Sequence, residues 1–167
     1  MDIYVNEKIR VSELGEQELR DISGIEEDTT LYEIISAIQA EGETPDLASL
    51  TAKVDKIMNE SHPGYRYFGI FSGEEYVGYA SLADCNGNTP DLGIELLKEW
   101  RGQGIGYCVL SALIKHIFTE REDIEYLSYR ARYDNEASLG LVKKLGGTPI
   151  ETGDFLEQLI KTYHIYR

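Results

Sequence analysis

A chain of 167 residues, 42% of them hydrophobic, is long enough to bury the core of one compact domain. Its 30 acidic residues against 16 basic ones give a net charge of −14, which repels a phosphate backbone, so nucleic acid is not expected as a partner. The sequence has no basic-then-apolar N-terminus and no run of 18 apolar residues, so we expect a cytoplasmic protein that does not associate with membranes.

The first 60 residues predict one strand followed by helices. Residues 3–11 alternate apolar and polar side chains, which is typical of a strand. Residues 14–22 and 31–40 have the pattern of acidic helices, and Asp46 stands where it would cap a further helix over 47–58.

The remainder of the chain predicts a meander followed by alternating helices and strands. Residues 65–71 and 76–82 are aromatic and β-branched runs joined by a short turn around Gly73, which indicates a hairpin, and residues 91–97 add a third strand. The following elements are a helix over 104–119, a strand over 125–132, a helix over 135–145 and strand material over 158–166. No repeat or linker interrupts them, so we expect a single domain over 1–167 of class α/β (α+β) with a mixed sheet.

Gly102, Gly104 and Gly106 stand between the strand over 91–97 and the amphipathic helix that follows. Without a Cβ, such residues let backbone N–H groups converge on a phosphate at the positive end of a helix. The segment lacks the Gly-Lys-Ser/Thr of a nucleotide-binding P-loop and the spacing of a dinucleotide-binding turn. It therefore predicts a pyrophosphate cradle of another kind, with a glycine-rich turn that binds nothing as the alternative.

The segment 101–106, Arg-Gly-Gln-Gly-Ile-Gly, resembles motif A of the GNAT superfamily of N-acetyltransferases, whose pattern is Arg/Gln-x-x-Gly-x-Gly/Ala. Residues 135–147, which begin with Asn135 and end in Leu-Gly-Gly, look like motif B of that family, and the likeness extends over roughly 65–150. The resemblance implies a GNAT-like mixed, mainly antiparallel sheet flanked by helices on both faces. It also implies transfer of an acetyl group from acetyl-CoA to a primary amine of a small molecule or protein by direct attack.

The same resemblance implies which residues hold the cofactor. The strand backbone would pair with the pantetheine arm, the glycine-rich segment would hold the pyrophosphate, and the start of the second helix would touch the arm from the other side. The residues implied are Leu96, Leu97, Arg101, Gly102, Gln103, Gly104, Ile105, Gly106, Asn135 and Ser138.

Attack by an amine requires its unprotonated form, so a base is expected, often acting through a water molecule. Glu95 is the first candidate because it is a lone acid in an apolar strand, with Asp91 and Asp84 behind it, although a solvent-facing or ion-paired role explains Glu95 equally well. The family often protonates the departing thiolate with a tyrosine where this chain has Val142. Another hydroxyl, Tyr133 first and then Tyr107 or Ser138, would then serve, or solvent would assist.

The cysteines and histidines indicate no metal site, because none has ligand spacing, and Cys108 is expected on the buried face of its helix. The negative charge favours a cationic acceptor, although solubility alone would also account for it. Because Val142 removes the usual proton donor, a non-catalytic acyl-CoA-binding sensor or interaction module is the alternative function. A homodimer also stays among the alternatives.

Overall fold

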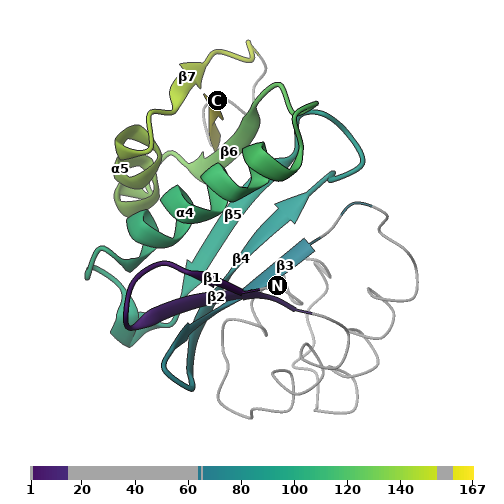
Figure 1. Cartoon of the computed structure of the whole chain (residues 1–167). Coiled ribbons are helices and arrows are strands. Elements are labelled where there is room, and N and C mark those ends of the chain that lie inside the picture. Colours follow the sequence, from purple (N-terminus) through teal and green to yellow (C-terminus); the bar gives the residue numbers. More distant parts are fainter. Residues whose placement is uncertain (1, 15–63, 65, 154–159) are drawn as a thin grey trace, which may run out of the picture.

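The computed structural model describes residues 2–14, 64, 66–153 and 160–167 (Figure 1). The helices predicted over 31–40 and 47–58, and nearly all of the one predicted over 14–22, lie outside the described residues. The elements are β1 (Asp2–Tyr4), β2 (Ile9–Glu13), β3 (Arg66–Ser72), β4 (Glu75–Ala83), β5 (Asp91–Leu96), a 3₁₀ turn (Lys98–Trp100), α4 (Ile105–Glu120), β6 (Leu127–Arg132), α5 (Glu136–Lys144), β7 (Thr148–Ile150) and β8 (Ile160–Ile165).

The described strands form one sheet in the order β1-β2-β3-β4-β5-β6-β8-β7. Every neighbouring pair is antiparallel except β5 and β6, which run parallel. The mixed, mainly antiparallel sheet that the resemblance implied is therefore confirmed. Helices α4 and α5 share one hydrophobic core with the sheet. The helices predicted for the other face belong to the segment that is not described.

The prediction of a single strand over 3–11 is wrong, because the segment folds back on itself. Strands β1 and β2 pair antiparallel, with Asp2 opposite Ser12. The Oδ1 atom of Asn6 accepts hydrogen bonds from the N–H groups of Lys8 and Ile9, at 2.8 and 2.9 Å. An asparagine that binds the backbone two and three residues ahead stabilises a turn, and this contact divides the alternating segment into a hairpin.

Strands β3, β4 and β5 form the predicted meander, with boundaries within one residue of those expected from the sequence. Their alternation divides the sheet into two faces. Phe68, Ala80 and Leu92 are at most 4% exposed and belong to the core. Glu95 stands opposite Tyr79 in the ladder, and neither belongs to this buried core.

Helix α4 covers the core with a stripe of buried side chains, namely Val109, Leu110, Leu113, Ile117 and Phe118. Cys108 is exposed, so the expectation that it faces the core is wrong. Cys108 lies two residues before Leu110. Because successive residues are about 100° apart around a helix, its side chain points about 200° from that of Leu110 and away from the buried stripe. None of the helices in the described residues is long and apolar enough to cross a membrane.

The feature of the fold that creates a site is the separation of β5 from β6. In these two strands the only residues that pair are Asp91 and Ser128, at the beginning of each strand. Beyond this point no ladder pair joins them. The backbone of β5 toward Leu96 therefore has an edge that β6 does not cover, and the N-terminus of α4 and the start of α5 lie beside this opening.

Candidate active site

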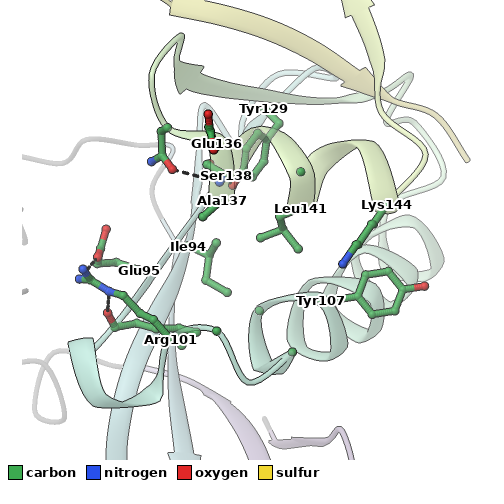
Figure 2. Close-up of a pocket in the computed structure, with 16 residues that line it drawn as sticks. Ile94, Glu95, Arg101, Tyr107, Tyr129, Glu136, Ala137, Ser138, Leu141 and Lys144 are labelled. Carbon is green, nitrogen blue, oxygen red and sulfur yellow. Dashed lines mark hydrogen bonds and ion pairs between the residues drawn. The ribbon is translucent and has the colours of Figure 1, made fainter.

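A cavity of about 590 Å³ lies between the ends of β5 and β6, the loop before α4 and the helix α5 (Figure 2). Its lining brings together the two segments that resembled family motifs, although about 30 residues separate them in the sequence. The lining residues are Ile94, Glu95, Leu96, Arg101, Gly102, Gly104, Gly106, Tyr107, Tyr129, Asn135, Glu136, Ala137, Ser138, Gly140, Leu141 and Lys144.

The glycine-rich loop forms the wall at the N-terminus of α4. Gly102 and Gly104 have φ angles of +74° and +79°, a left-handed conformation that favours glycine, and Gly104 is the N-cap of α4. A Cβ added at either residue would meet no atom within 4 Å. No side chain of the described residues caps this end of α4, and its first turn carries no acidic residue. The first N–H groups of the helix are thus available to an anion in the cavity.

Gly106 has a different use, because it lets α4 approach α5. A Cβ built on Gly106 would lie 3.4 Å from Leu141 Cδ2 and 3.8 Å from Ile94 Cδ1. The residue therefore marks the place where the two helices and β5 meet beside the cavity. Of the other residues predicted in this loop, Gln103 donates from its side chain to the Glu99 carbonyl at 2.7 Å. Neither Gln103 nor Ile105 lines the cavity.

Arg101 and Glu95 form an ion pair at one end of the cavity (Figure 2). The Arg101 guanidinium donates to Glu95 Oε1 at 2.6 Å and, through Nε, to the Leu96 carbonyl at 2.7 Å. These two contacts direct the guanidinium toward β5 and occupy a backbone acceptor that the sequence assigned to the cofactor arm. The Leu97 N–H, also assigned to the arm, donates to the Val77 carbonyl within the sheet at 2.9 Å, and Leu97 does not line the cavity.

The start of α5 forms the opposite wall. The Oδ1 atom of Asn135 accepts a hydrogen bond from the Ser138 N–H at 3.0 Å, as an N-cap side chain does. This cap fixes the first turn of α5, and with it the Ser138 side chain, against the cavity. Asn135 and Ser138 were both predicted to contact the cofactor, and both line the cavity.

Tyr129 on β6 is a lining residue that the sequence analysis missed. Its hydroxyl lies 2.7 Å from Ser138 Oγ, and the residue is only 3% exposed. Burial raises the pKa of the Tyr129 hydroxyl, the hydrogen bond to Ser138 acts in the opposite direction, and the charge of Glu95 adds to the increase. A signal was present in the sequence, because Tyr129 alternates with Leu127 and Ala131 on the core side of a strand. A tyrosine among such neighbours needs a partner for its hydroxyl.

The other candidate proton donors lie in different surroundings. Val142 is fully buried and does not line the cavity. A Cβ on Gly147 would lie 2.7 Å from Val142 Cγ2 and 2.9 Å from the Val142 carbonyl oxygen, so position 147 has no room for a side chain. Tyr133 is 53% exposed and does not line the cavity, whereas Tyr107 lines it and is 44% exposed.

The remaining predicted acids lie away from the cavity. Asp91, at the closed end of the opening between β5 and β6, is ion-paired with Arg130. Asp84 follows β4 in a turn with a φ angle of +55°, and it does not line the cavity. In the described residues there is no group of three or more His, Cys, Asp or Glu side chains that could hold a metal ion.

The cavity contains two cations in a chain whose net charge is −14. The charge of Arg101 is paired with Glu95, whereas the described residues offer Lys144 no ion-pair partner. Lys144 is in the last turn of α5 and reaches toward Tyr107 at the N-terminal end of α4 (Figure 2). An anionic ligand would therefore find a positive charge and free helix N–H groups at this end of the cavity.

Comparison with known proteins gives a consistent result. Residues 17–148 match the sequence model of the acetyltransferase (GNAT) domain. Among solved structures, RimL, a ribosomal L7/L12 alpha-N-protein acetyltransferase in complex with coenzyme A, is 18% identical, with 99% of this chain and 98% of that chain covered and a TM-score of 0.73.

A spermidine N-acetyltransferase from Vibrio cholerae, in complex with CoA and spermine, is 16% identical, with 96% of each chain covered and a TM-score of 0.70. The microcin C7 self-immunity acetyltransferase MccE, in complex with acetyl-CoA and AMP, is 14% identical, with 99% of this chain and 96% of that chain covered and a TM-score of 0.69. At these identities the likeness concerns the fold. A search of curated protein sequences finds no match.

Proposed function

The chain belongs to the acetyltransferase (GNAT) family, and on this premise we propose that the cavity between β5, α4 and α5 is its acetyl-CoA site. The activity of the chain is acetyl-CoA-dependent N-acetylation, in which an amine attacks the thioester directly. The observation that carries the site assignment is the uncovered edge of β5 beside an α4 N-terminus that no described side chain caps.

The residues present fit the chemistry of the cofactor. Its pyrophosphate would lie against the backbone N–H groups of residues 102–106, where glycine conformations keep the loop open toward the cavity. Its extended, amide-bearing arm would run along the uncovered edge of β5 toward Ser138. Lys144 would add a positive charge for a phosphate group, because the other cation of the cavity, Arg101, is paired with Glu95.

Glu95 is the proposed base for the incoming amine, acting through a water molecule. An alkyl amine has a pKa of about 10.4, so it must lose a proton before it attacks. Glu95 lines the cavity, and its ion pair with Arg101 holds the carboxylate in one orientation. The amine would approach along β5 toward Glu95, while the cofactor occupies the side of the α4 N-terminus.

Ser138 is the proposed proton donor for the departing thiolate. It lines the cavity, is held by the Asn135 cap and stands one helical turn before the buried Val142. Tyr133 was the first candidate from the sequence, but its exposure of 53% and its place outside the lining favour Ser138. Tyr107 lines the cavity beside Lys144, at the end proposed for the phosphates.

The acceptor is proposed to be a cationic primary amine of a small molecule or protein. The negative charge of the chain supports this class by attracting cations. The two structural neighbours named for ribosomal L7/L12 and for spermidine act on amines of both kinds. Two free cysteines, Cys85 and Cys108, support a reducing cytoplasmic location, and a homodimer stays an expectation for gel filtration to decide.

The test is turnover. The protein is incubated with acetyl-CoA and a panel of polyamines, aminoglycosides and peptides with free N-termini, and thiol release and acetylated product are measured together. Release of thiol in proportion to acetylated amine supports the enzyme. Tight acetyl-CoA binding without thiol release on any amine would instead favour the non-catalytic acyl-CoA-binding sensor. This second candidate stays because Val142, which cannot donate a proton, is buried at the position where the family often has a tyrosine.

A further inference from the structure

We propose that Tyr129 is a positioning residue for acetyl transfer, whose buried hydroxyl donates a hydrogen bond to Ser138 and thereby directs the Ser138 proton into the cavity. The inference rests on the proposed role of Ser138 as proton donor. It concerns a strand residue that belongs to neither of the motifs resembling the GNAT family.

The geometry joins two elements at a single contact. Tyr129 reaches from β6 across the core side of the sheet, and its hydroxyl lies 2.7 Å from Ser138 Oγ. Ser138 is held from the other direction, because its N–H donates to Asn135 Oδ1. The Ser138 hydroxyl is therefore fixed between its own helix cap and Tyr129, at the cavity wall (Figure 2).

Each hydroxyl has one proton, so one of the two donates and the other accepts. Tyr129 is 3% exposed, and Ser138 is the hydrogen-bond partner of its hydroxyl in the described residues. A phenol is a stronger acid than an alkyl hydroxyl and is the better donor of the two, so we assign the donated proton to Tyr129. Ser138 is half-buried at the cavity wall, so it can turn its proton toward the cavity.

The surroundings keep Tyr129 in the donating form. Burial raises the pKa of its hydroxyl, and the nearby carboxylate of Glu95 acts in the same direction. The phenol thus stays protonated over the neutral and mildly alkaline range, where N-acetylation of amines is measured. A phenylalanine would fill the same space between β6 and α5, so the hydroxyl is the part of the side chain that packing alone does not explain.

As the C–S bond of the thioester breaks, its electron pair stays on sulfur, and sulfur takes the proton of Ser138. The Tyr129 proton moves to Ser138 Oγ in the same step, so the negative charge rests on the phenol oxygen, which is the less basic of the two oxygens. The phenol recovers its proton from water in the cavity by way of Ser138, and the proton lost by the amine reaches solvent through Glu95.

The experiment is a double-mutant cycle with Tyr129→Phe, Ser138→Ala and both together, read by kcat, KM for acetyl-CoA and the binding constant of CoA. In the Ser138 background we expect Tyr129→Phe to lower kcat by about 3- to 10-fold, the range that corresponds to one hydrogen bond, with KM and CoA binding unchanged. In the Ser138→Ala background the same substitution should change kcat by less than about twofold, because its effect passes through Ser138.

Tyr163→Phe is the matched control. Tyr163 lies opposite Tyr129 in the ladder of β6 and β8 and is 6% exposed, so it tests removal of a phenol from the same face of the sheet. Its kcat should equal that of the unsubstituted protein. Melting curves of all variants exclude loss of folding as the cause of a low rate.

An equal loss of kcat in both backgrounds, or no loss in either, overturns the positioning role while leaving the acetyltransferase assignment intact. Absence of turnover by the unsubstituted protein on the whole amine panel would overturn the proposed function and this inference with it. The two failures are therefore told apart by the unsubstituted protein.

Discussion

Replacing Gly104 with alanine separates the conformation of the glycine-rich loop from its binding role. Gly104 has a φ angle of +79°, and the left-handed conformation costs an alanine about 1–2 kcal/mol. For a chain of this size the melting temperature should fall by about 2–8 °C. Gly73, in the turn between β3 and β4, has a φ angle of +62° and equally open surroundings. Gly73→Ala should therefore cost a similar amount of stability.

Acetyl-CoA distinguishes the two variants. At 100-fold over its dissociation constant, a ligand adds about 2.7 kcal/mol to the free energy of unfolding, or about 5–10 °C in melting temperature here. The unsubstituted protein and Gly73→Ala should show the same increase. Gly104→Ala should show a much smaller one, because its loop either leaves the conformation that directs the N–H groups at the phosphates or places a methyl group in their space. A full increase in Gly104→Ala would refute the assignment of this loop as the pyrophosphate site.

Lys144, Glu95 and Glu13 can each be tested by one substitution. Lys144→Ala should weaken acetyl-CoA binding by about two- to fivefold and reduce its salt dependence, as measured by calorimetry at two ionic strengths, whereas the exposed neighbour Lys143→Ala, which does not line the cavity, should change neither. Glu95→Gln should lower kcat by about 10²- to 10⁴-fold at constant KM for acetyl-CoA, and an unchanged kcat would refute the role of Glu95 as the base. Glu13 accepts a hydrogen bond from Arg66, which lowers the pKa of Glu13 below its ordinary 4.5, so this contact stabilises the fold above that pH and is lost as the pH falls through the lower pKa. Glu13→Gln should therefore lower the melting temperature at pH 7 and make the melting temperature fall less on acidification. A melting temperature that falls equally in both proteins between pH 7 and pH 3 would contradict this.

Sequence periodicity predicted most elements of the described fold, because the spacing of the side chains that become buried is set within each helix or strand. The meander and the two helices that follow it depend on apolar side chains at spacings of two or of three to four residues, and their boundaries lie within two residues of the prediction. The first hairpin was missed because Asn6 makes its turn through a side chain contact that alternation does not register. The prediction for Cys108 was wrong because its side chain points about 200° around α4 from that of the buried Leu110.

The sequence alone did not predict which side chains pair with each other, because this depends on which helices and strands pack together in the folded chain. Arg101 was expected to contact the cofactor, and the structure shows that its guanidinium binds Glu95 and the Leu96 carbonyl at the strand end. Tyr129 and Ser138 are nine residues apart with a turn between them, and only the packing of α5 against β6 places their hydroxyls 2.7 Å apart.

By itself the sequence determined the family, the cofactor class and the position of the glycine-rich loop, because the left-handed backbone conformations of Gly102 and Gly104 favour glycine at those chain positions. The tertiary structure decided which side chains complete the site. Strands β5 and β6 pair only at Asp91 and Ser128, and the space that opens beyond that pair brings α4 and α5 together around one cavity. Side chains from distant segments share this cavity because the sheet separates there, and no local pattern in the sequence records that separation.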